Sequence, residues 1–307
     1  MLTFVDCQTR VIDLVGKKQY DESLELMEKA KTTFPEKRDR LGHWKANVYC
    51  LLGERTKAIA ELQEIIDSGL WWNPDILNSD SELDVVKDTR EFQHILDQCE
   101  SIYRANQDSA QPLLKVEGND NAELAIFSLH WKASNVEDFS LEWQDKRLLN
   151  HYLIGFPQSS QLFSYNCFSW DDFEQTREDV RETYSTFSMN REIESEHVII
   201  SGASQGGGRA VELCLSQEAL FEKFIAVVPA FEDLDKLEKL ASTNKCNARG
   251  CIITGNRDPF YEGVLKAVSI LEKHSIPCKL IVIEGMGHEF PEDFPSVFEE
   301  AVRFVSR

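Results

Sequence analysis

One stretch decides how the fold of this chain is interpreted: Val198-Ile199-Ile200-Ser201-Gly202-Ala203-Ser204-Gln205-Gly206-Gly207-Gly208. Its apolar, β-branched start predicts a buried strand. The strand enters a Gly-x-Ser-x-Gly turn, and the apolar pattern at 210–215 predicts a helix directly after it. Strand, sharp turn and helix are the context of a nucleophile elbow, which would hold Ser204 in a strained conformation with its hydroxyl exposed.

The glycines of the turn fit this interpretation. A side chain at Gly202 or Gly206 would crowd the closely approaching strand and helix. The helix that follows Ser204 would direct its backbone N–H groups, and its positive dipole end, at the place where an oxyanion forms. A bare Gly-x-Ser-x-Gly also occurs as a plain glycine-rich turn. Residues further along the chain must therefore distinguish a nucleophile elbow from such a turn.

Two further residues follow predicted strands in the same way. Asp258 comes after the strand at 251–255, and His288 comes after the strand at 279–283. Serine, acid and histidine in this chain order are found in α/β-hydrolases. Carboxyl ends of parallel strands meet at one edge of a sheet, where such sheets build their sites. Asp258 alone could cap a helix and His288 alone could be an ordinary loop residue, but together with Ser204 they predict a catalytic triad.

The predicted roles follow from protonation chemistry. Ser204 is a weak nucleophile at neutral pH and needs a base. His288 would take its proton and return it to the leaving group. Asp258 would fix the tautomer of the imidazole and stabilise the imidazolium.

The pattern of residues 112–307 predicts an α/β domain with a mostly parallel sheet and helices on both faces. The strands are expected at 113–116, 124–129, 152–156, 198–201, 224–228, 251–255 and 279–283, and the helices at 172–187, 206–216, 233–241, 259–274 and 294–305. The acidic residues of the first helix, Glu174, Glu178, Asp179 and Glu182, are expected to form a solvated face.

Residues 1–107 are predicted to form a separate helical domain. The segments 16–30 and 53–66 resemble each other with an offset of 35 when Ser23 is aligned with Ala58, close to the ~34-residue period of tetratricopeptide repeats. Two repeats are fewer than the ~3 usually needed for independent stability, so we expect them to pack on the second domain. A further helix is predicted at 91–103, a loop and short turn at 80–88, and a polar linker at 105–112. The pair Trp71-Trp72 is interpreted as packing.

Composition narrows the function classes. The net charge of −20 argues against nucleic acid and anionic membrane surfaces as partners. The eight cysteines contain no C-x-x-C pair, which favours buried thiols in a reducing compartment. No apolar run approaches the ~20 residues of a membrane span. We therefore expect a cytoplasmic protein with no membrane span, no cofactor and no metal.

The motifs of residues 112–307 together resemble the serine α/β-hydrolases of the predicted esterase, carboxylesterase and phospholipase group. Gly202-Ala203-Ser204-Gln205-Gly206-Gly207 is similar to that group's Gly-x-Ser-Gln-Gly-Gly, and the stretch 153–161 with Trp170-Asp171-Asp172 is similar to a segment of such esterases. The helical N-terminal part resembles extensions of uncharacterised hydrolases. The resemblance implies cleavage of a small-molecule carboxylic ester or thioester through an acyl-enzyme.

The same resemblance locates the oxyanion hole. The first donor would be the backbone N–H of Gln205. The second would come from the loop usually written Leu-His-Gly-x-Gly, which reads Leu129-His130-Trp131-Lys132-Ala133 here, so that alignment assigns it to the backbone N–H of Lys132. Trp131 replaces a glycine and is expected to narrow the loop conformations or to fill part of the site. His130 is interpreted as a structural loop residue.

Two alternatives remain open. A weakened oxyanion loop is compatible with a hydrolase-fold binding protein whose helical repeats hold a peptide or protein partner, or mediate self-association. A serine peptidase on the same scaffold is the third possibility.

Overall fold

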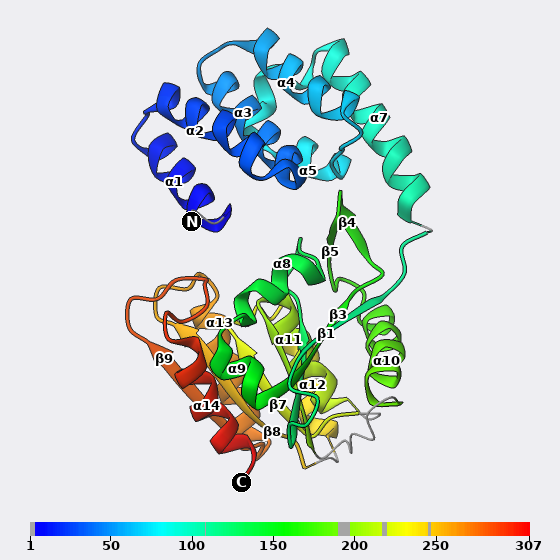
Figure 1. Cartoon of the computed structure of the whole chain (residues 1–307), viewed down its shortest axis with the longest axis vertical. Helices are drawn as coiled ribbons and strands as arrows, with labels where there is room; N and C mark the ends of the chain where they lie inside the picture. Colours follow the sequence, from blue (N-terminus) through cyan, green and yellow to red (C-terminus); the bar gives the residue numbers. More distant parts are fainter. Residues whose placement is uncertain (1–3, 108, 190–196, 217–219, 245–246) are drawn as a thin grey trace. The chain divides into compact units, whose positions relative to one another are not determined.

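The computed structural model describes residues 4–107, 109–189, 197–216, 220–244 and 247–307 (Figure 1). The chain divides into two compact units, residues 1–109 and 110–307. The expected fold class is confirmed: a helical region precedes a mostly parallel sheet with helices.

The first unit is built from helices. Its elements are α1 (Phe4–Gly16), α2 (Tyr20–Thr33), η1 (Pro35–Lys37), α3 (Arg38–Leu51), α4 (Arg55–Asp67), α5 (Pro74–Ser79), η2 (Ser81–Leu83), α6 (Asp84–Lys87) and α7 (Arg90–Gln107). The helices α1, α2 and α3 each pack against the next helix in the chain, and α4 also packs against α7. Trp71 and Trp72 are buried, and the indole N–H of Trp72 donates to the carbonyl of Asp39 at 3.1 Å. The pair therefore packs within this unit, as expected.

The prediction of a loop and short turn at 80–88 is only partly confirmed, because residues 81–87 form two consecutive helical turns, η2 and α6. The Asp80 carboxylate caps this segment by accepting from the backbone N–H of Glu82 at 2.9 Å. Leu83 and Val86 are fully buried. Capping and burial of these two apolar side chains stabilise a segment whose polar composition suggests a loop.

Charged side chains are buried between α2, α3 and α4. The Glu61 carboxylate accepts from the ammonium groups of Lys31 and Lys45, the latter at 2.9 Å, and all three side chains are at least nine-tenths buried. Removing one partner from such a cluster leaves a buried charge unpaired, which is strongly destabilising. The cluster therefore fixes how these three helices pack.

The second unit alternates strands and helices. Its strands are β1 (Leu113–Gly118), β2 (Leu124–Leu129), β3 (Tyr152–Gln158), β4 (Leu162–Ser164), β5 (Cys167–Phe168), β6 (Val198–Ala203), β7 (Lys223–Val227), β8 (Arg249–Gly255) and β9 (Cys278–Ile283). Its helices are α8 (Val136–Ser140), η3 (Leu141–Trp143), α9 (Lys146–His151), α10 (Phe173–Met189), α11 (Gln205–Leu215), α12 (Leu234–Thr243), α13 (Tyr261–Lys273) and α14 (Phe294–Val305).

Seven of these strands form one sheet in the order β1-β3-β2-β6-β7-β8-β9. Only β1 runs antiparallel to its neighbour, β3, and the other neighbouring pairs are parallel. Every predicted strand is present with nearly the expected bounds. The short hairpin of β4 and β5 and the helices α8 and α9 were not predicted. They lie between β2 and α10, where no long periodic pattern occurs.

Helices cover both faces of the sheet (Figure 1). One core contains apolar side chains of α10, α11, α12 and α13, and the other contains those of α8, α9 and α14. The adjacent residues Ile199 and Ile200 on β6 belong to opposite cores, because successive side chains of a strand point to opposite faces. The sequences of the central strands are therefore apolar at nearly every position.

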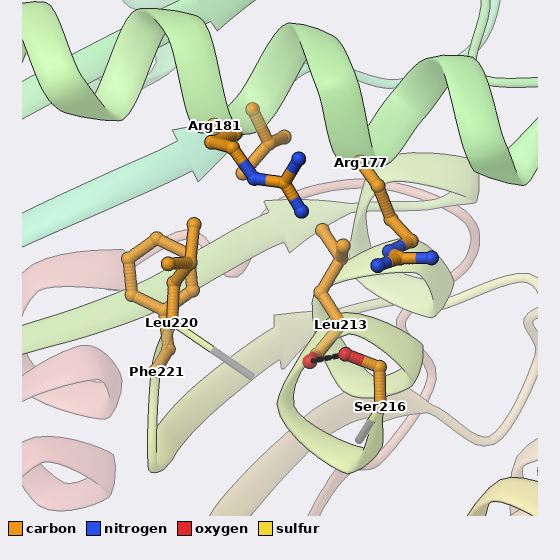
Figure 2. A pocket seen from close by; sticks show the side chains of 7 residues that line it. Arg177, Arg181, Leu213, Ser216, Leu220 and Phe221 are labelled. Atoms are coloured by element: carbon orange, nitrogen blue, oxygen red, sulfur yellow. Dashed lines mark hydrogen bonds between the residues drawn. The ribbon is translucent and has the colours of Figure 1, made fainter. Parts of the chain in front are cut away.

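The far end of α11 borders a small hollow of about 10 Å³. Figure 2 shows the side chains that surround it, including Arg177, Arg181, Leu213, Ser216, Leu220 and Phe221. The Ser216 hydroxyl donates to the carbonyl of Leu213 at 2.9 Å and closes the last turn of the helix. Since Ser204 precedes the first turn of the same helix, this hollow lies at the opposite end of α11 from that serine.

In the described ranges no helix is long and apolar enough to cross a membrane. Seven of the eight cysteines form no disulfide within the described part of the chain, and six of these are buried. Cys246 lies outside the described residues.

Candidate active site

Ser204 forms the turn between β6 and α11 with φ 51° and ψ −121°. A positive φ is strained for a residue with a side chain and persists only where its surroundings hold it. Here the Ser204 N–H donates to the carbonyl of Val227 at 3.0 Å, and its carbonyl accepts from Gly208 and Ala230 at 3.0 and 2.9 Å. The end of β7 and the first turn of α11 therefore hold the serine in this conformation.

The two glycines of the elbow allow backbone segments to meet. A Cβ on Gly202 would lie 2.4 Å from the carbonyl oxygen of Gly206. A Cβ on Gly206 would lie 2.4 Å from the carbonyl oxygen of His130 and 2.5 Å from that of Leu129. The crowding predicted from the sequence is confirmed, and the loop after β2 lies directly on the first turn of α11.

Ser204, His288 and Asp258 are brought together from the ends of three strands. The imidazole Nε2 of His288 lies 2.8 Å from the Ser204 Oγ, and its Nδ1 lies 2.9 Å from the Asp258 Oδ2. A carboxylate can only accept, so Nδ1 carries the proton and Nε2 is left to accept the serine hydroxyl proton. The Asp258 side chain is fully buried, whereas that of His288 is 29% exposed.

The second oxygen of Asp258 has its own partner. Oδ1 accepts from the backbone N–H of Phe260 at 2.7 Å, and α13 begins at Tyr261. The carboxylate thus anchors the turn before this helix and contacts His288 at the same time. The helix-capping interpretation of Asp258 is not confirmed, because the N-cap residue of α13 is Phe260 and no side chain caps this helix.

The loop that carries His288 is tied to the loop that carries Asp258. The Asn256 side chain donates to the Glu284 carboxylate and accepts from the Gly285 N–H, both at 2.7 Å. A Cβ on Gly255 would lie 2.0 Å from the carbonyl oxygen of Met286. Asn256 was not singled out in the sequence; its place directly after β8, two residues before Asp258, is the signal that could have identified it.

Gln205 and Lys132 are connected through a third residue. The Gln205 side-chain amide donates to Asp171 Oδ1 at 2.7 Å, and the Lys132 ammonium donates to the same oxygen at 2.6 Å. Burial by itself would raise the pKa of Asp171, but hydrogen bonds from Lys132, Gln205 and Ser169 outweigh it and lower this pKa below its ordinary value. Asp171 remains a carboxylate that joins the loop after β2 to the elbow.

His130 is buried beside the elbow and uses both ring nitrogens. Nδ1 lies 2.7 Å from the carbonyl oxygen of Trp131, and Nε2 lies 3.3 Å from the backbone nitrogen of Ser159. Burial lowers the pKa of His130 to about 4, although its hydrogen bond to Trp131 acts in the opposite direction. These contacts agree with the structural interpretation of His130.

One helix residue expected in solvent is buried instead. Asp179 on α10 is 2% exposed. Its carboxylate accepts from the Ser160 backbone N–H at 2.7 Å and from the Ser159 hydroxyl at 3.1 Å. The expectation of a solvated face is therefore wrong for Asp179, because the serine pair after β3 supplies the hydrogen bonds that compensate for its burial.

Aromatic side chains border the candidate site. The Phe260 ring centroid lies 5.1 Å from that of His288, and the Phe260 side chain is well exposed. The Trp131 indole makes edge-to-face contacts with Phe139 and Phe290, with centroids 5.9 and 5.7 Å apart. Trp131 is thus packed between α8 and the segment after His288. This contact joins the loop after β2 to the loop of the imidazole.

In the parts of the chain that are described, no group of three or more His, Cys, Asp or Glu side chains is arranged to hold a metal ion.

Comparison with known proteins agrees with this architecture. Residues 3–107 match the family model described as "A/B hydrolase-like, N-terminal domain". An uncharacterized protein from Bacillus cereus ATCC 10987 shares the fold, with 23% identity, a TM-score of 0.54 and coverage of 99% of both chains. Esterase PE8 matches 64% of this chain and 99% of its own, with 16% identity and a TM-score of 0.53. No curated protein matches this chain.

These matches show the fold. The chain has an α/β-hydrolase fold preceded by a helical region like the N-terminal domain of α/β-hydrolase-like proteins. The Bacillus cereus protein aligns along nearly its whole length, so the combination of a helical part and an α/β part occurs in another solved structure.

Proposed function

We propose that this protein is a serine hydrolase that cleaves carboxylic esters or thioesters through an acyl-enzyme. The observation that carries the proposal is the continuous series of hydrogen bonds from the Ser204 Oγ through the His288 imidazole to the Asp258 carboxylate. The fold that the chain shares with a protein named esterase PE8 supports it.

In the first half of the reaction, the Ser204 Oγ attacks the carbonyl carbon of the substrate while His288 Nε2 takes the hydroxyl proton. The tetrahedral intermediate then collapses, and its bond to the leaving oxygen or sulfur breaks. The leaving group takes the proton from His288 and departs as an alcohol or thiol. Asp258 stabilises the imidazolium while it exists.

In the second half, water attacks the acyl-Ser204 ester and gives a proton to His288 Nε2. Collapse of this second tetrahedral intermediate releases the carboxylic acid and returns the proton to the Ser204 Oγ. We propose that the backbone N–H groups of Gln205 and Lys132 stabilise the oxyanion in both halves. Losing one such donor typically lowers kcat by about 100- to 1000-fold.

The test is replacement of the nucleophile. Ser204→Ala is expected to abolish hydrolysis of short p-nitrophenyl esters and labelling by a fluorophosphonate probe. Ser216→Ala is a matched control because it removes a hydroxyl at the other end of α11, where the hydroxyl bonds only to a helix carbonyl. Hydrolysis by the Ser204 variant at the wild-type rate would show that another group is the nucleophile. Comparing ester with amide substrates separates an esterase from a peptidase.

A groove in the helical unit favours the binding-protein alternative. It has a volume of about 360 Å³ and is lined mainly by residues of α1 and α3, with apolar side chains from Val11, Ile12, Val15 and Trp44 and a carboxylate from Glu82. A peptide with an apolar side chain beside a basic residue has the chemistry to fill it. If the folded protein is not labelled by the probe and copurifies with such a peptide, binding rather than hydrolysis is its function.

A further inference from the structure

Two successive carbonyl groups of the loop after β2 are each held by a buried side chain. The carbonyl of His130 accepts from the indole N–H of Trp170 at 2.8 Å. The carbonyl of Trp131 accepts from Nδ1 of His130, 2.7 Å away. Trp170 and His130 are both fully buried, and their ring centroids lie 4.8 Å apart. The backbone of this loop is therefore oriented from inside the domain.

The partners of His130 determine its tautomer. A backbone N–H can only donate, so the contact from Ser159 requires a lone pair on Nε2. A carbonyl oxygen can only accept, so the contact to Trp131 requires the proton on Nδ1. Only the neutral Nδ1–H form satisfies both partners. Ser159 is itself held, because its hydroxyl donates to the buried carboxylate of Asp179.

The carbonyl of Trp131 and the N–H of Lys132 belong to one peptide group. A peptide group is planar and trans, so its N–H points opposite to its C=O. We infer that His130 is a positioning residue: by holding the carbonyl of Trp131, it aims the Lys132 N–H as the second oxyanion donor. This inference rests on the proposed function.

Trp131 stands where the related loop motif has glycine, and this difference explains what the contact from His130 to the Trp131 carbonyl does. The indole of Trp131 is packed against Phe139 and Phe290, and the Lys132 ammonium is bonded to Asp171. Side chains are thus fixed on both sides of the peptide group, but neither contact sets the rotation of the peptide plane. The bond from His130 acts on that plane directly.

Three substitutions separate orientation of the peptide from general support of the fold. His130→Asn places an amide nitrogen near the position of Nδ1 and can still donate to Trp131. His130→Leu fills similar space but has no donor. His130→Gln is long enough to accept from Ser159 but does not place a donor at Trp131. All three lose the contact between the imidazole and Trp170, so that contact cannot explain a difference among them.

The readouts are kcat and KM on a p-nitrophenyl ester, the rate and final extent of fluorophosphonate labelling, and the melting temperature. We expect His130→Leu and His130→Gln to lower kcat by about 10- to 1000-fold, the upper value being the loss of an oxyanion donor outright. KM should change little, because the lost interaction acts in the transition state. Labelling should become slower but still reach completion. His130→Asn should retain a kcat at least about tenfold above that of the leucine variant.

His151→Leu is the matched control, because Nδ1 of His151 also contacts a backbone carbonyl, that of Arg147, at 2.6 Å but on the surface. It should behave like the wild type. Equal kcat values for the asparagine, leucine and glutamine variants would overturn the inference, whether those values are high or low. If the leucine variant does not fold, the comparison of kcat between the asparagine and glutamine variants tests the inference. A wild-type protein without Ser204-dependent turnover would refute the proposed function instead.

Discussion

The protonation of His130 provides a prediction about stability. Burial lowers the pKa of this imidazole from the ordinary 6.5 to about 4 in the folded protein. Between these two values the unfolded chain binds a proton that the folded chain does not. Stability rises with pH wherever the unfolded state binds more protons. His130 should therefore reduce the stability progressively as the pH falls below about 6.5, until the folded imidazole also becomes protonated at about 4.

The size of the effect follows from these two pKa values. At pH 5 the unfolded imidazole is almost fully protonated, about 1.5 pH units below its own pKa, while the folded imidazole remains mostly neutral. Each pH unit corresponds to about 1.4 kcal/mol. The free energy of unfolding should thus fall by about 2 kcal/mol between pH 7 and pH 5 through His130 alone.

Urea unfolding of the wild type and of His130→Asn, at several pH values from 7 to 5, measures this contribution. The asparagine variant has no imidazole at this position to titrate. All other titratable groups are shared, so the difference between the two pH profiles isolates His130. The transition of residues 1–109, where it is resolved, should have the same pH dependence in both proteins. Parallel profiles for the α/β unit would refute the argument that His130 is held neutral by burial.

Three other substitutions test the remaining structure. Asp258→Asn should lower kcat by about 10⁴-fold with little change in KM, because an amide can impose the wrong tautomer on His288; single-turnover and steady-state kinetics measure it. Glu61→Gln should lower the free energy of unfolding of the helical unit by about 3 kcal/mol, because Lys31 and Lys45 lose their buried carboxylate and keep only exposed glutamates as partners; urea unfolding measures it. Gly255→Ala should destabilise the α/β unit by about 1–3 kcal/mol and lower kcat, because its Cβ meets the Met286 carbonyl in the loop that carries His288.

Two of these substitutions have a matched control. Glu25→Gln removes an exposed ion pair and should change stability by less than about 0.5 kcal/mol; an equal loss in both glutamate variants would contradict the role of burial. Gly263→Ala adds a Cβ into open space on α13 and should stabilise by about 0.4–1 kcal/mol. A tolerated alanine at position 255 would mean that the two loops are not closely packed. An Asp258 variant with wild-type kcat would remove that residue from the mechanism.

The sequence was sufficient for the main elements of the α/β unit. Its central strands are apolar on both faces and are separated by helices with a clear period, so their positions were predicted to within about two residues. The short elements were not predicted, because burial and capping stabilise them and neither leaves a periodic pattern. The turns at 81–87 depend on the Asp80 cap and on the burial of Leu83 and Val86. The charge of Asp179 suggested a side chain exposed to solvent, and only its hydrogen bonds with Ser159 and Ser160 explain its burial.

For the site, the sequence supplied residue types and their order. Ser204, Asp258 and His288 each follow a strand, and parallel strands present their ends at one edge; this was enough to predict that they meet. Their catalytic roles remain a proposal. The place of Asn256 after β8 could have marked it as a site residue, but the sequence could not indicate its partners or that Asp171 joins Lys132 to Gln205, because these contacts link positions far apart in the chain.

By itself, then, the sequence determined the order of strands and helices, the serine turn and the acid and base that follow later strands, because local pattern and chain order encode them. The tertiary structure alone decided which nitrogen of His130 carries its proton, which carbonyl that proton holds and how the loop after β2 lies on the first turn of α11. Hydrogen-bond direction and burial decide such features. Both arise only when segments distant in sequence pack against each other.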